Sequence, residues 1–238
     1  MAEINLIDKY PKSNRPIDAR GRMKLASGLR LDRSDFTPTD VIFEQQLISR
    51  VRTFGWEYFD GDRLYGYGGY NYDPRFWQGT VKRLIEHYGL AVDAKVLDVG
   101  CAKGFFLFDL KLLYPQMTVA GLDVSDYALS KAKDEVKPFL TLGSADKLPY
   151  PDNSFDLVVS INTVHSLDID GCSRALLEIQ RVSKKHCFVV VNAWRTDEEK
   201  ERLLQWNIAA KTYMHVDDWK RHFDDIGYRG DYYWFFAE

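Results

Sequence analysis

Cysteine is scarce in this sequence, and the few cysteines form no recognisable pattern. Three occur among 238 residues, Cys101, Cys172 and Cys187, with wide spacing, no C-x-x-C pair and no run of histidines beside them. Scattered cysteines in an odd number predict neither a disulfide framework nor a zinc site. We therefore expect no metal and a reducing, cytoplasmic location.

Long apolar runs and a strong excess of one charge are also missing. No stretch approaches the about 18 consecutive apolar residues of a membrane-spanning helix, and the N-terminus, MAEINLIDKYPKSNRP, lacks the basic and apolar segments of an export signal. The formal net charge is −3, whereas general nucleic-acid binders carry clustered Lys and Arg. We expect no membrane association and disfavour nucleic acid as a partner; the oligomeric state is left open.

The first third of the chain is predicted to be an irregular arm followed by helices. Residues 1 to about 38 are polar and lack periodicity, which predicts an arm that wraps the domain or is partly disordered. A helix is expected after Thr39, a suitable N-cap, and a turn at residues 59–63; a second helix is expected after Asp73, with Pro74 in its first position. The apolar faces expected for these helices are Val41, Phe43, Leu47, Val51 and Phe54, and then Trp77, Val81, Leu84, Ile85 and Tyr88.

From Lys95 onward, short apolar strands alternate with helical segments. This pattern predicts an α/β fold, a doubly wound, mostly parallel Rossmann-like sheet of about six to seven strands with helices on both faces, behind the N-terminal helical extension. Ligands of such sheets bind beyond the carboxyl ends of the strands. The expected strands are 95–100, 118–124, 139–145, 155–162 and 187–194, and the expected helices are 104–114, 125–136, 172–185 and 216–227.

A glycine turn follows the first expected strand, in VLDVGCAKGFF at 96–106. Gly100 and Gly104 let the backbone approach a ligand closely, although two glycines alone are a weak signal. The second strand ends in GLDVS, so Asp123 lies where a carboxylate can accept hydrogen bonds from both hydroxyls of a ribose. A dinucleotide-binding enzyme is disfavoured, because its G-x-G-x-x-G fingerprint is replaced here by G-x-A-x-G.

Together these residues resemble the class I S-adenosylmethionine-dependent methyltransferases, whose motif I is D/E-x-G-x-G-x-G. The motif is Asp98, Gly100, Ala102 and Gly104 here, with alanine at the middle glycine, and LPYPDNSFDLVVSINTVHSL at 148–167 is similar to the branch typified by ubiquinone and menaquinone C-methyltransferases. The resemblance covers residues 80 to 228. It implies S-adenosylmethionine as the cofactor, an arm and lid over residues 1–74, and a methyltransferase domain over residues 75–238.

The resemblance also implies a set of residues at the cofactor. Val124 matches the position that packs on the adenine face, and Ser144 and Ala145 follow the third strand, where the branch often has an aspartate near the adenine amino group. Asp146 either supplies that missing charge or is a solvated turn carboxylate. Asn162 is expected beside the cofactor pocket.

His165 is the leading candidate for a general base on the acceptor. The alternative is a histidine that packs at the sheet edge and hydrogen-bonds to the backbone, because a single histidine is weak evidence.

The stretch YGYGGYNYDPRFW, at 65–77, is expected to form a lid. Its glycines give backbone freedom, and its tyrosines, among them Tyr72, can exclude water and still hydrogen-bond to the cofactor. Arg75 is expected to meet the cofactor carboxylate. The alternative is a rigid aromatic turn packed against the sheet.

The function expected from the resemblance is methyl transfer from S-adenosylmethionine to a small-molecule acceptor. Two alternatives stay open, a methyltransferase acting on RNA or protein and a non-catalytic S-adenosylmethionine-binding protein. No N-P-P-Y-like motif follows the fourth strand, which disfavours an amino-group nucleic-acid methyltransferase. Only YRGDYYWFFAE remains after the last expected helix, so the final hairpin usual in the family is expected to be shortened.

Overall fold

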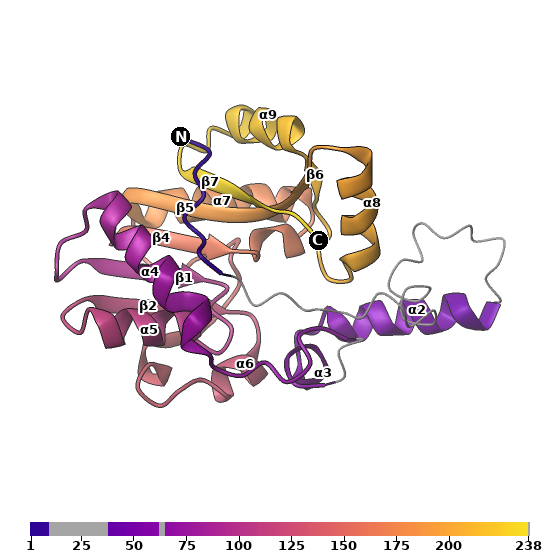
Figure 1. The fold of residues 1–238 in the computed structure, drawn as a ribbon, viewed down its shortest axis with the longest axis horizontal. Coiled ribbons are helices and arrows are strands. Elements are labelled where there is room, and N and C mark those ends of the chain that lie inside the picture. Colours follow the sequence, from indigo (N-terminus) through magenta and orange to yellow (C-terminus); the bar gives the residue numbers. More distant parts are fainter. Residues whose placement is uncertain (10–37, 62–64, 238) are drawn as a thin grey trace.

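The structure is a computed structural model, and it describes residues 1–9, 38–61 and 65–237. Its centre is a sheet of strand order β3-β2-β1-β4-β5-β6, with β7 also paired to β5 (Figure 1). Every pair among these strands is parallel, which confirms the predicted parallel sheet. The strands are β1 (Lys95–Val99), β2 (Thr118–Asp123), β3 (Leu140–Leu142), β4 (Phe155–Ile161), β5 (Ser183–Trp194), β6 (Met214–His215) and β7 (Asp231–Phe235).

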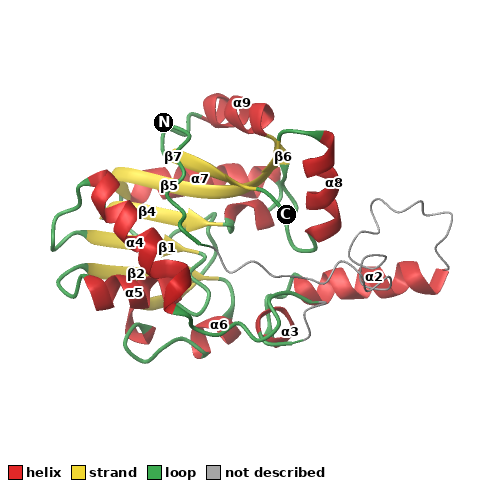
Figure 2. Ribbon diagram, in the orientation of Figure 1, coloured by secondary structure: helices red, strands yellow, loops and turns green. Residues whose placement is uncertain are grey.

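Helices cover both faces of the sheet, as predicted (Figure 2). In β1, Val96 packs in the cluster beneath α4 and α5, whereas Leu97 and Val99 pack in the cluster beneath α7 and α9. Both faces are therefore apolar, as parallel strands require. The helices are α2 (Pro38–Val51), α3 (Trp56–Phe59), α4 (Pro74–Tyr88), α5 (Phe105–Leu113), α6 (Asp126–Ser130), α7 (Ile169–Val182), α8 (Asp197–Trp206) and α9 (Val216–Ile226), with 3-10 turns η2 (Lys137–Phe139) and η3 (Val164–Ser166).

The predicted start of α4 is confirmed, and that of α2 is shifted. Asp73 Oδ1 accepts a hydrogen bond from the amide of Arg75 at 3.0 Å, with Pro74 in the first helical position. The helix α2 begins at Pro38, so Thr39 is a helical residue rather than the N-cap. Leu47 and Val51 of its expected face are buried, whereas the side chains of residues 41 and 43 lie outside the described part, as does the arm over residues 10–37. The turn expected at 59–63 is described only to residue 61 and follows the short helix α3.

Two further expectations differ from the structure. The helix predicted over 125–136 ends at Ser130, whose hydroxyl donates to the carbonyl of Tyr127 at 2.7 Å, a local bond that competes with helix continuation. The helix α8 was not predicted, although Thr196 and Glu199 have the T-x-x-E spacing of a helix start. The N-cap Thr196 Oγ1 accepts from the amide of Glu199, and the Glu199 carboxylate accepts from the amide of Arg195, one residue before the N-cap.

The C-terminal edge of the sheet contains no antiparallel hairpin among the described strands. Instead, β7 follows α9 and pairs in parallel with β5, with Val190 opposite Tyr233. The first residues of the chain cover the outer edge of β7, where Ile4 N donates to Tyr232 O at 2.9 Å and Tyr232 N donates to Ala2 O at 3.0 Å. This pairing protects an edge strand that would otherwise be open to another chain.

None of the helices in the described residues is long and apolar enough to cross a membrane.

Candidate active site

A cavity opens at the carboxyl ends of β1, β2, β3 and β4, the position expected for a ligand of this fold. Its other walls come from the N-terminal segment up to Tyr70, from α4 and α5, from the turn after β4 and from the loop before β6. The residues that line it are Arg52, Thr53, Phe54, Tyr58, Phe59, Tyr67, Tyr70, Trp77, Asp98, Gly100, Cys101, Ala102, Phe105, Phe106, Leu122, Asp123, Val124, Gly143, Ser144, Ala145, Ile161, Asn162, Thr163, Ser166, Leu167 and Lys211.

The glycine turn after β1 is held on the end of β2. The amides of Gly100 and Cys101 donate to Leu122 O at 2.7 and 3.1 Å. Gly100 has φ +86°, and a Cβ there would lie 2.0 Å from Thr163 Oγ1, so a side chain is excluded. Gly104, with φ +69°, is the N-cap of α5 and does not line the cavity.

Asp123 lines the cavity with a carboxylate that is only partly used by the backbone. Its Oδ2 accepts from Ala102 N at 2.7 Å and its Oδ1 accepts from Ser125 N at 2.8 Å. Each oxygen has a further acceptor position available for a ligand hydroxyl. Burial raises the pKa of Asp123, and these backbone hydrogen bonds oppose that effect. The neighbouring Val124 is 58% exposed and offers an apolar face to the same cavity.

Asp98 lies at the end of β1 in the same cavity and is 6% exposed. Burial, followed by repulsion from Asp123, raises the pKa of Asp98 to about 8. At neutral pH this carboxyl therefore holds its proton most of the time and is a hydrogen-bond donor.

Ser144 and Ala145 line the cavity after β3, whereas Asp146 does not. Asp146 is nevertheless coupled to it, because Ser144 Oγ donates to Asp146 Oδ1 at 2.5 Å. Arg174 of α7 donates to the other carboxylate oxygen of Asp146 at 3.3 Å. These bonds, with that from Ser144 the largest effect, lower the pKa of Asp146. Since its proton is committed to Asp146, the Ser144 hydroxyl presents acceptor lone pairs to the cavity.

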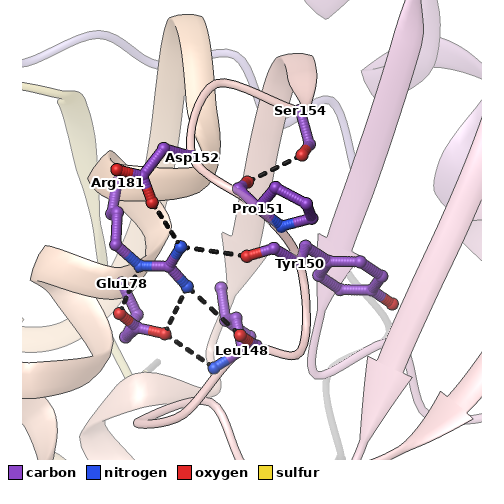
Figure 3. Close-up of polar contacts among 7 residues, drawn as sticks. All are labelled: Leu148, Tyr150, Pro151, Asp152, Ser154, Glu178 and Arg181. Carbon is purple, nitrogen blue, oxygen red and sulfur yellow. Dashed lines mark hydrogen bonds and ion pairs between the residues drawn. The ribbon is translucent and has the colours of Figure 1, made fainter.

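The loop that continues from Asp146 to β4 is fastened to α7 through Arg181 (Figure 3). The Arg181 guanidinium donates to Tyr150 O at 2.9 Å, to Leu148 O at 3.1 Å and to the carboxylates of Asp152 and Glu178. Glu178 in turn accepts from Leu148 N at 2.8 Å. This network fixes the segment that carries Ser144 and Ala145.

Two residues predicted to contact the cofactor, Tyr72 and Arg75, are not among the cavity-lining residues. The Tyr72 hydroxyl donates to Asp109 Oδ1 at 2.6 Å, on α5. The Arg75 side chain is 66% exposed and pairs with Asp73 at 2.7 Å. Tyr67 and Tyr70 of the same stretch do line the cavity, with ring centroids 4.7 Å apart.

Lys103, which sequence reasoning missed, joins the glycine turn to the N-terminal segment. Its Nζ donates to both carboxylate oxygens of Asp60 and to Tyr70 O at 2.7 Å. Tyr127 also donates to Asp60, at 2.7 Å. Burial raises the pKa of Asp60, but the hydrogen bonds from Lys103 and Tyr127 outweigh it and the net pKa is lowered. A lysine between the motif glycines is the only sequence signal for this contact.

His165, the predicted base, is 4% exposed and does not line the cavity. Its Nδ1 accepts from the amide of Asn192 at 3.1 Å, and burial lowers its pKa to about 3. This is the alternative arrangement, a histidine bound to backbone at the sheet edge. Asn162 does line the cavity, with φ +56°, and neither its Oδ1 nor its Nδ2 has a partner although both atoms are buried. A buried amide without a partner is unusual in a native protein and marks a position where a ligand can bind.

The three cysteines are free and buried, and no metal-binding group of His, Cys, Asp or Glu occurs within the described part of the chain.

Residues 97–191 match the family described as a methyltransferase domain. The chain is 32% identical over 128 residues to malonyl-[acyl-carrier protein] O-methyltransferase of Legionella pneumophila, a match covering 52% of this chain and 44% of that protein. It is 33% identical over 152 residues to cycloartenol-C-24-methyltransferase of Arabidopsis thaliana, covering 56% and 44%. The YcgJ protein from Bacillus subtilis has a similar fold, with a TM-score of 0.50 at 20% identity over 61% of this chain and 66% of that one.

Residues 97–191 are therefore similar to a methyltransferase domain, in agreement with the resemblance found in the sequence. The chain spans less than half the length of these two curated relatives. The finer resemblance to the ubiquinone and menaquinone branch, and the division of the chain at residue 74, stay predictions.

The cofactor of class I methyltransferases is S-adenosylmethionine, and the donor and acceptor groups of this cavity fit it. Asp123 retains acceptor positions for vicinal hydroxyls, Val124 offers an apolar surface for a base, and Ser144 offers an acceptor beside it. The amide of Asn162, near the end of β4, has a free donor and a free acceptor for a ligand. A ribose, an adenine and an amino acid require hydrogen-bonding and apolar partners of these kinds.

Proposed function

We propose that the protein transfers the methyl group of S-adenosylmethionine to a small-molecule acceptor by in-line displacement. The observation that carries this proposal is a cavity lined both by the motif residues Asp98, Gly100 and Asp123 and by Asn162, whose buried amide has no partner. One wall is suited to the cofactor, and the space toward β4 is left for an acceptor. Because the curated relatives are named for a malonyl group on an acyl-carrier protein and for cycloartenol, they support methyl transfer without defining the acceptor.

We assign the cofactor to the ends of β1, β2 and β3. Asp123 accepts from the ribose hydroxyls, Val124 packs on the adenine, and Ser144 accepts from the adenine amino group, with Ala145 beside it. Ala102 stands where the family has glycine, and its φ of +49° keeps the turn in the shape that a glycine would adopt. Asp98, protonated at neutral pH, donates a hydrogen bond or orders the turn.

The reaction places few demands on acid–base groups. A lone pair of the acceptor forms a bond to the methyl carbon while the carbon–sulfur bond breaks and its electron pair returns to sulfur; any proton on the acceptor atom leaves to solvent or to a base. The protein's part is to align the reacting atoms and exclude water. The described lining contains no histidine. We therefore assign His165 a structural role.

The N-terminal segment is proposed to close the cavity. Tyr67 and Tyr70 line it, and the amides of both donate to carbonyls of residues 58 and 59, so the aromatic stretch and α3 form one unit. Lys103 connects this unit to the glycine turn. A lid of this kind would exclude water from the methyl group, as closure does in other enzymes.

The test has two parts. Calorimetry with S-adenosylhomocysteine, the demethylated product, measures binding. Transfer is measured by incubating the protein and methyl-labelled S-adenosylmethionine separately with the low-molecular-weight ultrafiltrate and with the macromolecular retentate of a cell lysate. We expect binding and a labelled small product that is absent with Asp123→Ala. Binding without label in any fraction would support the non-catalytic alternative, and label confined to the macromolecular retentate would support an RNA or protein acceptor.

A further inference from the structure

Two cations, Arg52 and Lys211, line the cavity. Arg52 follows the last residue of α2, and Lys211 lies in the loop between α8 and β6. Both residues are exposed. Within the described residues, neither side chain has a hydrogen bond or an ion pair. Other arginines of the chain, such as Arg181 and Arg195, are paired with carboxylates.

The two cations come from segments that pack against each other. Leu47 and Val51 of α2 form a separate apolar cluster with Ile208, three residues before Lys211. In Figure 1, α2 accordingly passes beside the lower end of α8. Arg52 directly follows Val51, so Arg52 and Lys211 line the cavity from two segments that pack together.

The loop of Lys211 is fixed over the end of β4. The amides of Lys211 and Thr212 donate to His165 O at 2.9 and 3.0 Å, and Thr212 Oγ1 donates to Leu167 O at 2.8 Å. His165 and Leu167 belong to the turn that starts immediately after Asn162. The loop that carries Lys211 is therefore bonded to the turn that follows Asn162, and both residues line the cavity.

The carboxylates of the cavity lie on different elements. Asp98 ends β1 and Asp123 ends β2, where the cofactor is assigned, and these are the only acidic side chains among the described lining residues. The wall made by α2, the turn after β4 and the 207–211 loop has cations and a neutral amide but no carboxylate. Positive charge that no carboxylate on this wall compensates favours a negatively charged ligand.

We propose that the methyl acceptor is a small organic anion, whose carboxylate or phosphate is held by Arg52 and Lys211 and whose reacting end lies near Asn162. This inference rests on the proposed methyltransferase function. An anionic oxygen pairs with both cations through charge-assisted hydrogen bonds, and Asn162 Nδ2 supplies a neutral donor. The rival occupant of the cations is the carboxylate of the cofactor itself.

The first experiment sorts the acceptor by charge before its identity is known. The lysate ultrafiltrate is passed at neutral pH over a strong anion exchanger, and the flow-through and the salt eluate are each incubated with the protein and methyl-labelled S-adenosylmethionine. We expect label from the eluate and none from the flow-through. Treating the eluate with phosphatase before the incubation should abolish the label if the anionic group of the acceptor is a phosphate, and should leave the label unchanged if that group is a carboxylate. Label from the flow-through alone would overturn the anionic acceptor while leaving the methyltransferase function intact, whereas no label from either fraction would overturn the proposed function itself.

The second experiment separates the acceptor from the cofactor. Arg52→Gln and Lys211→Gln are each expected to raise the eluate concentration needed for half-maximal rate about tenfold, the effect of losing a charge-assisted hydrogen bond, with unchanged affinity for S-adenosylhomocysteine. Arg52→Lys and Lys211→Arg should restore most of the loss. Arg50→Gln is the matched control, since Arg50 is an exposed residue of α2 outside the cavity lining. A loss of S-adenosylhomocysteine affinity in the glutamine variants would assign the cations to the cofactor carboxylate and contradict the proposal. An equal effect of Arg50→Gln would also contradict it, because the change in rate would then follow from the net charge of the protein.

Discussion

Lys103 Nζ lies 2.6 Å from Oδ1 and 2.8 Å from Oδ2 of Asp60, and both residues are largely removed from solvent, with side chains 5% and 21% exposed. The pair connects two parts of the chain that are distant in sequence, the glycine turn of motif I and the end of α3. A buried ion pair contributes little net stability when intact, but removing one partner leaves an uncompensated charge. The contact therefore acts as a positional constraint between the lid segment and the cofactor turn.

Lys103→Met should destabilise the protein and loosen the N-terminal segment. Breaking a buried pair typically costs about 3–5 kcal/mol of unfolding free energy, measured by denaturant titration. Hydrogen exchange of residues 65–73 should be faster in this variant than in the parent. Binding of S-adenosylhomocysteine should slow this exchange. The slowing should be largest at Tyr67 and Tyr70 and smaller at Tyr72, which is outside the cavity lining. Lys131→Met, at an exposed lysine beside Tyr127, is the control. Equally slow exchange in the unmutated protein with and without ligand would show that residues 65–73 are a fixed turn.

Asp123→Ala should weaken binding of S-adenosylhomocysteine strongly. The change removes a charged acceptor for two hydroxyls, and such hydrogen bonds contribute about 1.5–3 kcal/mol, or about 10- to 150-fold in Kd by calorimetry. Asp126→Ala, at an exposed carboxylate three residues later, should bind normally. An unchanged Kd for Asp123→Ala would remove this residue from the cofactor site.

Asp98→Asn should change the pH dependence of stability more than it changes ligand affinity. The folded pKa of Asp98 is about 8, above the unfolded value near 3.8. Between these values the folded state binds a proton that the unfolded state lacks, so the free energy of unfolding falls as pH rises, by at most about 1.4 kcal/mol per pH unit. Asparagine mimics the protonated acid and removes this slope. Denaturant titrations at pH 5 to 8 should therefore show the variant gaining stability relative to the parent as pH rises; parallel curves would contradict a protonated Asp98.

His165→Asn should make the protein less sensitive to acid. Burial lowers the folded pKa of His165 to about 3, below the ordinary value of 6.5, so between these values only the unfolded state binds the proton. The parent therefore loses stability as pH falls from about 6.5 toward 3, by at most about 1.4 kcal/mol per unit from this group. The amide oxygen of asparagine can still accept from Asn192 N, while the titration is absent. Turnover should survive at neutral pH, and a large loss of kcat in a stable variant would return His165 to the catalytic machinery.

The parts of the fold and site that sequence reasoning predicted are those determined by local pattern. The apolar runs that became β1, β2 and β4 are buried on both faces, and the positions of Asp98, Gly100 and Asp123 follow because carboxyl ends of parallel strands share one edge. The T-x-x-E spacing of Thr196 and Glu199 is a local signal for the start of α8. The pairing of β7 with both β5 and the chain's first residues depends on contacts between distant segments.

The site residues that were missed are set by tertiary contacts. Nothing in the local sequence indicates that Lys103 reaches Asp60, or that Arg52 and Lys211 line the same cavity. Arg75 and Tyr72 were predicted from their place in the aromatic stretch, yet Arg75 is drawn to the N-cap Asp73 and Tyr72 to Asp109 of α5. His165 has the right sequence position after β4 but turns inward to the backbone of β5.

The coupling of Ser144 to Asp146 should make the cofactor site selective for adenine. While its proton is committed to Asp146, Ser144 offers only lone pairs, which suit the adenine amino group and oppose the carbonyl oxygen of the inosine analogue of S-adenosylhomocysteine. An unsatisfied acceptor pair costs about 1–3 kcal/mol, so calorimetry should show the parent binding the adenine form about 5- to 150-fold more tightly. In Asp146→Asn the asparagine amide can donate to Ser144, which frees the serine proton to meet a carbonyl, and the ratio should fall toward one. Asp152→Asn is the matched control. It removes a carboxylate of the same loop, which pairs with Arg181 of α7, but leaves Ser144 unchanged, so the ratio of the two affinities should be kept. If Asp146→Asn keeps the parent's ratio, Asp146 only positions the loop, and groups other than Ser144 distinguish adenine from hypoxanthine.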